Sequence, residues 1–536
     1  MTVDWKTVIW LMPEISLVVM ATWIFLCGTV KKWQNRPVLS FVGIASFCVA
    51  ALSLYKQISV DDWVYWTESF NWLKNPKVSP LDAGPVAIDF LANWCRWIAI
   101  VAGILLVLMG SRNVAKRLSA EYLGTVLLTV VGLMLIGNAG EMVMLFLGLE
   151  LVSIPTYVLL FLGRHDRSSA ESTAKYFFLS ILSSAILLYG FSFLYGIRGT
   201  TSLTAAVGPT EAILGAEGLA FGEIALVLIV AGIAFKIAAV PFHFYAPDVY
   251  QGTTNANAGL LAVVPKIAGV VALLRIMPAM LPFVAEFAWQ LTIALALLSM
   301  TLGNVCALWQ NDVRRMMAYS SIAHAGYMLI GVAVALASAS TGGVSATLFY
   351  LSVYMFASIA TFAALTYLSS DERELSKVDD LAGLGRRQPL VAAVLGLAMF
   401  SLAGIPPLVG FWGKFSLFTS AVSVAIHSED AQQAKWFVVL AIVGALNAAV
   451  AAAYYLRVIG TMYFRSATTD EPATPRPGMG AFGAMCACGV LLLVLGVMPT
   501  NMMRFADHAG HAVQRRIQTS QSSFDSRPKA TAFDDN

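Results

Sequence analysis

Residues 143–162 read VMLFLGLELVSIPTYVLLFL, an apolar stretch with a single carboxylate, Glu150, near its middle. About 20 apolar residues cross ~30 Å of hydrocarbon as an α-helix, so this stretch predicts a transmembrane helix. Other apolar stretches carry lone lysines in the same way, namely Lys236, Lys266 and Lys414. A charge at the centre of a membrane helix costs roughly 2.5 to 3.5 kcal/mol, and four such charges cost on the order of 10 kcal/mol. We therefore expect compensating partner charges or a water-filled path for ions.

The composition extends this prediction to the whole chain. Hydrophobic residues make up 58% and charged residues 12%, and the mean hydropathy is +0.74. Such a chain has too few charges for a soluble surface. The pattern predicts an all-α polytopic membrane protein with about fourteen transmembrane helices, near residues 7–29, 38–56, 87–110, 120–138, 141–162, 171–195, 222–250, 256–277, 284–308, 313–336, 345–369, 389–424, 436–460 and 480–500. The first helix is expected to remain in the mature protein, because MTVDWK lacks the basic region of a signal peptide.

Motifs for cofactors and metals are missing from the sequence. The cysteines lie in apolar segments without the paired spacing of a zinc or iron–sulfur site, and we expect them to pack as small hydrophobic residues. The sequence contains no Walker loop, no GxGxxG turn after a strand and no nucleophile elbow. We therefore expect no cofactor, no metal ion and no nucleic-acid partner for this chain, and an energy source outside it.

The distribution of basic residues predicts the orientation. Most connections after odd-numbered helices are rich in lysine and arginine, and under the positive-inside rule they are cytoplasmic. These residues are Lys31, Lys32, Arg36, Arg112, Lys116, Arg117, Arg164, Arg167, Arg314, Arg315, Arg373, Lys377, Arg386 and Arg387, against mainly Lys74, Lys77, Arg198 and Lys435 in even-numbered connections. With fourteen helices, both termini are then expected on the non-cytoplasmic side. The polar tail is expected to be solvated or to contact a partner.

Two of the expected helices are too long and are interrupted by proline. Residues 232–252 place Lys236 before Pro241, and residues 401–418 place Lys414 after Pro407. Proline removes a backbone donor, and in hydrocarbon the freed carbonyls must find water or side chains, so such breaks are tolerated beside a hydrated cavity. The alternative is that these prolines are packing kinks in ordinary helices.

The two interrupted helices are five helices apart, and the order of lysine and proline is reversed between them. This spacing suggests two five-helix units related by an inverted repeat, as in many transporters. We expect an N-terminal three-helix segment over 1–119, a first repeat over 120–280 and a second over 281–465. The fourteenth helix then falls within 466–503 and the polar tail within 504–536.

Three of the charged positions are judged by their depth. Lys266 lies near the middle of its helix, too deep for its side chain to reach the membrane surface easily, which favours a functional role. Glu150 is equally central and has the opposite charge, so pairing with a lysine of a neighbouring helix is the natural way to hold both groups. Lys175 lies near the cytoplasmic end of its helix, and position alone leaves open whether it is a surface lysine.

Two histidines and one ion pair complete the candidates. His324 lies in mid-helix near Ser320 and Ser321, where it is either a hydrogen-bonded core residue or a proton relay. His243, beside Pro241, either bridges a relay or caps freed carbonyls. Glu14 and Arg96 are expected to be structural ion partners.

Several motifs resemble one protein family closely. They are MPEISLVVMA (12–21), FLGLELVSIPTYVL (146–159), STAKYF (172–177), FKIAAVPFHFYAPDVYQG (235–252), RRMMAYSSIAHAGYMLIG (314–331) and DLAGLGRRQPLVAAVLGLAMFSLAGIPPLVGFWGKF (380–415). Together they resemble the subunit N family among the antiporter-like subunits of proton-pumping NADH:quinone oxidoreductase, respiratory complex I. The segment PDVYQG favours this family over Mrp-type antiporters. The resemblance covers nearly the whole chain and leaves out the tail beyond residue 503.

The resemblance implies a proton path and a set of partners. It implies fourteen helices with inverted repeats, Glu150 paired with Lys175, Lys236 at the centre, Lys266 as the link and Lys414 toward the exit. It also implies a cell inner membrane location, other membrane-arm subunits as partners, and flavin, iron–sulfur clusters and a quinone site in those other subunits. Quinone reduction elsewhere would alter the Glu150/Lys175 pair and move a proton through Lys236, Lys266 and Lys414. An Mrp-like cation/proton antiporter, or the same subunit in a complex with another electron donor, remains an alternative.

Overall fold

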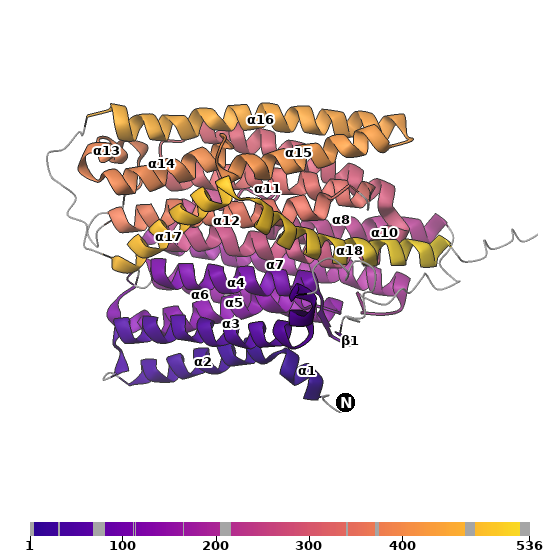
Figure 1. Ribbon diagram of the computed structural model, residues 1–536, viewed down its shortest axis with the longest axis horizontal. Coiled ribbons are helices and arrows are strands. Elements are labelled where there is room, and N and C mark those ends of the chain that lie inside the picture. Colours follow the sequence, from indigo (N-terminus) through magenta and orange to yellow (C-terminus); the bar gives the residue numbers. More distant parts are fainter. Residues whose placement is uncertain are drawn as a thin grey trace, which may run out of the picture.

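The computed structural model is a bundle of roughly parallel long helices (Figure 1). It describes residues 5–30, 33–67, 81–110, 112, 114–164, 166–203, 216–338, 341–369, 375–466 and 478–525. Within these residues, 14 helices are long and apolar enough to cross a membrane. The predicted number of transmembrane helices is thereby confirmed. A short antiparallel hairpin of β1 (Leu81–Ala83) and β2 (Val86–Ile88) was not predicted.

The N-terminal part contains three of these long helices. They are α2 (Met12–Thr29), α3 (Arg36–Thr67) and α4 (Phe90–Gly110), preceded by the short α1 (Trp5–Trp10). The predicted pair of Glu14 and Arg96 is confirmed: the guanidinium donates to both carboxylate oxygens at 2.7 and 3.2 Å, and both side chains are buried. Asn138 donates to the same carboxylate at 2.6 Å and so ties the pair to the next helix.

The same order of helices occurs twice in the remainder of the bundle. The first series is α5 (Ser119–Gly137), α6 (Met142–Gly163), α7 (Arg167–Arg198), α8 (Ala216–Ile237) with α9 (Ala246–Gly252), and the first part of α10 (Asn255–Leu308). The second is the rest of α10, α11 (Val313–Ala337), α12 (Gly343–Leu368), α14 (Pro389–Ala403) with α15 (Val409–His427), and α16 (Ala431–Phe464). Five is an odd number, so the two series begin at opposite ends of the bundle.

Short elements occur in two of the described connections. They include the 3-10 turns η3 (Lys116–Leu118) and η5 (Val378–Leu381) and the single-turn helix α13 (Leu384–Arg387). We call the end of the bundle that carries α1 and the hairpin the N-terminal face, and the other end, which carries α13, the opposite face (Figure 1). The predicted eighth and ninth helices are joined as α10, which departs from helical geometry at Val284.

The two predicted helix breaks are confirmed. Residues 238–245 separate α8 from α9, and Ala238 adopts a positive φ of 57°. Residues 404–408 separate α14 from α15, where Gly404 has a φ of 85°. Lys236 lies in the last turn before the first break, and Lys414 lies shortly after the second, so the reversed order of lysine and break places both lysines beside interrupted backbone.

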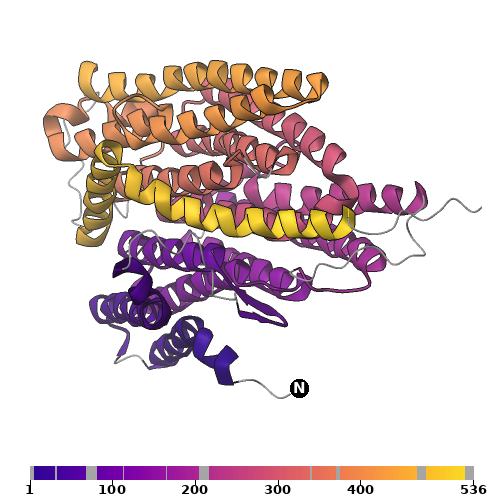
Figure 2. The same ribbon diagram turned by 45° about the vertical axis from the view of Figure 1, so that its right-hand side comes forward.

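The C-terminal part differs from the prediction of a tail that is solvated or contacts a partner. The fourteenth transmembrane helix, α17 (Met479–Val497), is followed directly by α18 (Thr500–Asp525). Figure 2 shows α18 along the boundary between the N-terminal helices and the two repeats, and it contacts α4, α10 and α12. Its apolar residues recur every three or four positions and are buried there: Ala506, Ala509, Val513 and Ile517. The described part of the tail, up to Asp525, is therefore an amphipathic helix that packs on its own chain.

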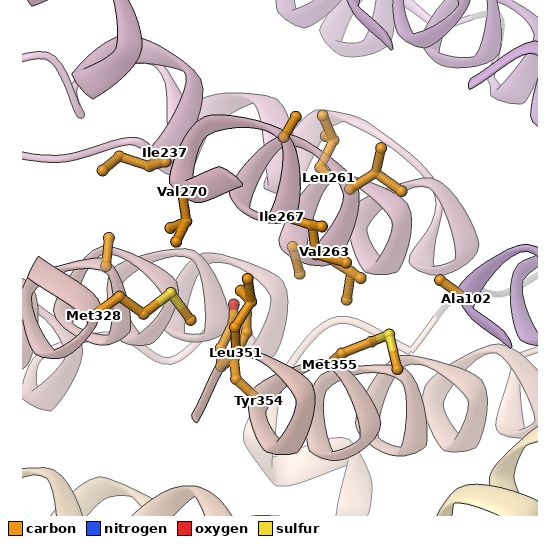
Figure 3. Close-up of a cluster of buried hydrophobic side chains, with 14 of the residues drawn as sticks. Ala102, Ile237, Leu261, Val263, Ile267, Val270, Met328, Leu351, Tyr354 and Met355 are labelled. Carbon is orange, nitrogen blue, oxygen red and sulfur yellow. The ribbon is translucent and has the colours of Figure 1, made fainter. Parts of the chain in front are cut away.

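The first part of α10 forms the centre of the bundle. Every residue of its membrane-spanning part, Asn255–Met280, is buried. Figure 3 shows Leu261, Val263, Ile267 and Val270 of this helix packed among side chains of α8, α11 and α12, including Ile237, Met328 and Met355. The position of α10 brings Lys266 to the middle of the protein.

Candidate functional site

The first part of the site is a buried ion pair surrounded by serines. The Lys236 ammonium on α8 lies 3.6 Å from the Glu150 carboxylate on α6. The lysine also donates to three hydroxyls of α6 and α7, Ser153 at 2.6 Å, Ser180 at 3.1 Å and Ser184 at 3.3 Å. Ser184 in turn donates to Glu150 at 2.5 Å. The lysine side chain is 3% exposed and the glutamate side chain 20%, so each charge has its main compensation in the other.

Lys175 is not the partner of Glu150, which corrects the expectation drawn from the resemblance. Its ammonium contacts Glu171 at 2.7 Å and Asp248 at 3.0 Å near the opposite face, and its side chain is 41% exposed. Lys175 precedes Ser184 on α7 by nine residues. Nine residues are about two and a half helical turns, or ~13 Å, so the two side chains leave different sides of the helix at different depths. The residue that meets Glu150 is therefore Lys236.

Lys266 and Lys414 bind backbone carbonyls at the two helix breaks. Lys266 donates to the carbonyl of Ile237, the last residue of α8, at 3.0 Å. Lys414 donates to the carbonyls of Leu402 and Ala403, at the end of α14, at 2.8 and 2.9 Å. In the described residues neither lysine forms an ion pair with a carboxylate. Carbonyl dipoles compensate a charge less completely than a carboxylate does.

His324 lies between these two lysines. Its ring centroid is 4.9 Å from that of Tyr354, whose ring lies 6.0 Å from the Lys266 ammonium. On the other side it is 5.9 Å from the ring of Tyr327, which lies 5.0 Å from the Lys414 ammonium. The position supports the interpretation of His324 as a relay over that of a core residue with no link to the lysines.

Tyrosine hydroxyls on α12 and α16 complete the surroundings of His324. Its Nδ1 lies 2.5 Å from the Tyr350 hydroxyl and its Nε2 lies 3.0 Å from the Tyr455 hydroxyl, which also bonds to Ser320. A neutral imidazole has one donor and one acceptor nitrogen, and hydroxyls do both, so this chain of groups can pass a proton. Sequence analysis missed these tyrosines, although a polar aromatic pair at positions 350 and 354 within an apolar helix was a usable signal.

A second set of hydroxyls lies next to the first break. Ser321 accepts from Tyr354 at 3.0 Å and lies 3.2 Å from the Tyr250 hydroxyl, which follows the first break on α9. His243 lies within that break and is half buried, and in the described residues no hydrogen bond joins it to Lys236 or its serines. The structure thus brings Lys236, Lys266, His324 and Lys414 into one series and leaves His243 and Lys175 outside it.

Metal ligands do not cluster in the described parts of the chain. No group of three or more histidine, cysteine, aspartate or glutamate side chains there is arranged to hold a metal ion. The groups that the site does contain, ammonium, carboxylate, imidazole and hydroxyl, exchange protons.

Comparisons with known proteins agree with this chemistry. Residues 139–428 match the sequence model of the family described as "NADH:quinone oxidoreductase/Mrp antiporter, TM". The chain is 34% identical over 506 residues to NADH-quinone oxidoreductase subunit N of Rhodospirillum rubrum, covering 94% of this chain and 96% of the relative. It is 38% identical over 427 residues to the subunit of the same name from Moorella thermoacetica, covering 79% and 85%.

Two solved structures share the fold. A chain of respiratory complex I from Thermus thermophilus is 30% identical, with a TM-score of 0.72, covering 92% of this chain and 99% of that one. A chain of the Mrp complex from Dietzia is 19% identical with a TM-score of 0.76, covering 95% and 99%. The second likeness concerns the fold alone.

Proposed function

This chain belongs to the family of NADH:quinone oxidoreductase and Mrp antiporter transmembrane subunits, and among them to the subunit N relatives, so we propose that it translocates protons in the membrane arm of an NADH:quinone oxidoreductase. The observation that carries this proposal is the buried series of Glu150, Lys236, Lys266, His324 and Lys414. Each of these groups can bind and release a proton, and each lies in a different helix of the two repeats.

The ion pair is proposed to be the control point. While Glu150 is charged and lies against Lys236, the carboxylate stabilises the ammonium. Moving or neutralising the carboxylate leaves a buried, uncompensated cation, which is unstable in a low-dielectric interior. The Lys236 proton is then released toward Lys266, whose ammonium binds the carbonyl of the residue next to Lys236.

The second part of the path runs through hydroxyls. A proton leaving Lys266 passes Tyr354 and reaches the His324 group, and Tyr327 and Tyr350 then connect it with Lys414. The redox chemistry occurs in other subunits, which supply the change at Glu150. Flavin, iron–sulfur clusters and the quinone site belong to those partners, which are other membrane-arm and peripheral subunits of the complex.

The location follows from charge. The basic residues of the described connections gather at the opposite face, among them Arg164, Arg315, Lys377 and Arg387. Under the positive-inside rule this face is cytoplasmic, in a bacterial inner membrane, and both termini lie on the other side. The identity to subunit N relatives favours this role over that of an Mrp-like antiporter, for which the structural likeness is below 20% identity.

The test uses the assembled complex in sealed vesicles. Lys236→Ala should assemble, because the change is local, but should lose proton pumping and the quinone reduction coupled to it. Lys236→Arg should also fail, since a guanidinium does not deprotonate in proteins. Lys116→Ala, a surface lysine before α5, is the control that should pump normally. Normal pumping by assembled Lys236→Ala would refute the proposal, and native purification without a flavin-containing arm would favour the antiporter.

A further inference from the structure

A fully buried asparagine lies beside the second part of the path. Asn304, in the second part of α10, is 0% exposed, and its side chain contacts polar groups on two other helices. The amide nitrogen lies 3.3 Å from the hydroxyl of Tyr327 on α11, and the amide oxygen accepts from the hydroxyl of Tyr454 on α16 at 3.1 Å. A buried amide without partners is costly, so both ends need a hydrogen bond. Here each end of the amide meets a tyrosine.

Two glycines allow α10 and α11 to approach each other closely at this point. Gly303 and Gly326 directly precede the two residues of the Asn304–Tyr327 pair. A Cβ on Gly303 would lie 2.6 Å from a backbone nitrogen of α11, and a Cβ on Gly326 would lie 2.7 Å from a backbone nitrogen of α10. Small residues at such contacts let helix backbones pack closely in a membrane. The short asparagine side chain can therefore reach the tyrosine hydroxyl.

A second asparagine fixes the direction of the amide. The main-chain and side-chain oxygens of Asn447 on α16 lie 3.1 and 3.2 Å from the Asn304 nitrogen. Turning the amide round would place its oxygen against these two oxygens, which repel it. The nitrogen therefore stays on the side of Tyr327. Because an amide nitrogen donates and does not accept, the Tyr327 oxygen accepts from it, and the phenol hydrogen points away from Asn304.

Tyr327 connects the amide with Lys414. The Tyr327 ring lies 5.0 Å from the Lys414 ammonium and 5.9 Å from the ring of His324. A cation within about 6 Å of an aromatic ring is attracted to the face of the ring. A tyrosine ring turns about the bonds next to its Cβ, so a hydrogen bond at the hydroxyl, the far end of the side chain, restricts the ring strongly. The bond from Asn304 therefore holds the ring beside both the ammonium and the imidazole.

The other end of the amide lies near the same histidine. The Tyr454 ring packs against Tyr455, with 4.3 Å between the ring centroids, and the Tyr455 hydroxyl lies 3.0 Å from Nε2 of His324. One amide thus contacts side chains on both sides of the transfer between His324 and Lys414. An asparagine amide is not a titratable group, so its role there is to orient its neighbours.

We propose that Asn304 is a positioning residue for proton transfer between His324 and Lys414. Its amide holds the Tyr327 ring on the Lys414 ammonium and turns the phenol hydrogen away from Asn304, so that the hydroxyl can donate within the path. The inference rests on the proposed function. Without the amide, the Tyr327 ring leaves the ammonium for part of the time, and each transfer takes longer.

The first test measures proton uptake by sealed vesicles that contain the assembled complex. Asn304→Leu keeps the branched shape of the side chain and removes its hydrogen-bonding groups. It should slow uptake per complex about fivefold, the effect of losing one hydrogen bond of ordinary strength from the transfer. Thr292→Val is the matched control, because Thr292 is also buried on the second part of α10 and its hydroxyl donates within that helix, to Ala288. The control should pump at the parent rate.

The solvent isotope effect separates positioning from a structural role. Proton uptake and NADH oxidation are measured per assembled complex in H2O and in D2O. If the transfer beside Tyr327 becomes the slow step, the ratio of the two rates should rise in Asn304→Leu and stay at the parent value in Thr292→Val. A lower yield or melting temperature of Asn304→Leu with a parent rate and a parent ratio would show that Asn304 only holds helices together, which overturns the proposal.

Tyr327→Phe removes the same hydrogen bond from the other side and keeps the ring. It should slow uptake to a similar degree. The double variant should be no slower than the slower of the two single variants, because both changes break one contact. Multiplied effects would mean that Asn304 does not act through Tyr327, and they overturn the proposal. Parent pumping by Tyr327→Phe overturns it as well, even if Asn304→Leu does not assemble.

Lys236→Ala separates a failure of this inference from a failure of the proposed function. If Asn304→Leu pumps at the parent rate while Lys236→Ala is inactive, the positioning role of Asn304 is wrong and the proposed function stands. If Lys236→Ala itself pumps normally, the proposed function has failed, and the inference fails with it.

Discussion

Glu150→Gln isolates the charge of the ion pair from its shape. Glutamine has nearly the same size and keeps an oxygen that can accept from Ser184, so packing between α6, α7 and α8 is preserved. The substitution removes the electrostatic attraction between the carboxylate and the Lys236 ammonium. Two unit charges 3.6 Å apart attract by about 4 to 5 kcal/mol at an effective dielectric constant of about 20. This is an upper bound, because the carboxylate remains 20% exposed and is partly screened by solvent.

The expected result is an assembled complex with little proton pumping, because Lys236 no longer holds its proton between turnovers. Glu150→Asp, which keeps the charge on a shorter side chain, should be milder. The assay is the rate of proton uptake by sealed vesicles, measured with a pH-sensitive dye alongside NADH oxidation and the yield of assembled complex.

Double-mutant cycles then identify the partner of Glu150. The effects of Glu150→Gln and Lys236→Met on the free energy of unfolding should be non-additive by about 1 kcal/mol or more, as for groups in contact. The effects of Glu150→Gln and Lys175→Met should be additive within about 0.5 kcal/mol. Additivity with Lys236 and coupling with Lys175 would refute the pairing described above and restore the one implied by family resemblance.

Three further changes test individual contacts. A Cβ on Gly404 would lie 2.9 Å from the Lys414 side chain, so Gly404→Ala should displace the Lys414 ammonium and slow pumping. Gly84 also has a positive φ, but a Cβ there meets open space, so Gly84→Ala should not slow pumping. Equal effects of the two substitutions would show that backbone strain alone is responsible. Tyr455→Phe should slow pumping by removing a His324 partner; pumping at the parent rate would exclude Tyr455 from the path. Glu14→Gln should lower the melting temperature and the yield of the complex, because breaking a buried ion pair costs about 3 to 5 kcal/mol. Pumping per assembled complex should persist. Unchanged stability would contradict a structural role of the pair.

The candidate charges were recognisable from the sequence because their cost in hydrocarbon is so high. Glu150, Lys236, Lys266 and Lys414 stand alone in apolar stretches, and a membrane helix retains such groups only where something compensates them. His324 was recognisable for a related reason, as a titratable side chain deep in a helix. The partner of each charge was not recognisable from the sequence. A partner lies on another helix, and a one-dimensional pattern does not show the rotation and depth of neighbouring helices.

The packing of the C-terminal helix α18 was also not recognisable from the sequence. Its polar composition predicts a solvated tail, but four small or apolar residues at helical spacing are enough to pack it against α4, α10 and α12. The pattern was present in residues 506–517 but weak beside the surrounding charges. Its burial also depends on a groove formed by three distant segments.

By itself the sequence determined the number and approximate positions of the membrane helices and the sites of the two breaks, because hydrophobic length and proline act locally along the chain. Only the tertiary structure decided that Glu150 meets Lys236 and that Lys175 lies near the opposite face. It also decided that tyrosines of α12 and α16 surround His324 and that α18 packs against α4, α10 and α12. Each of these depends on how separate helices turn toward one another, and that rotation is fixed by the packing of the whole bundle.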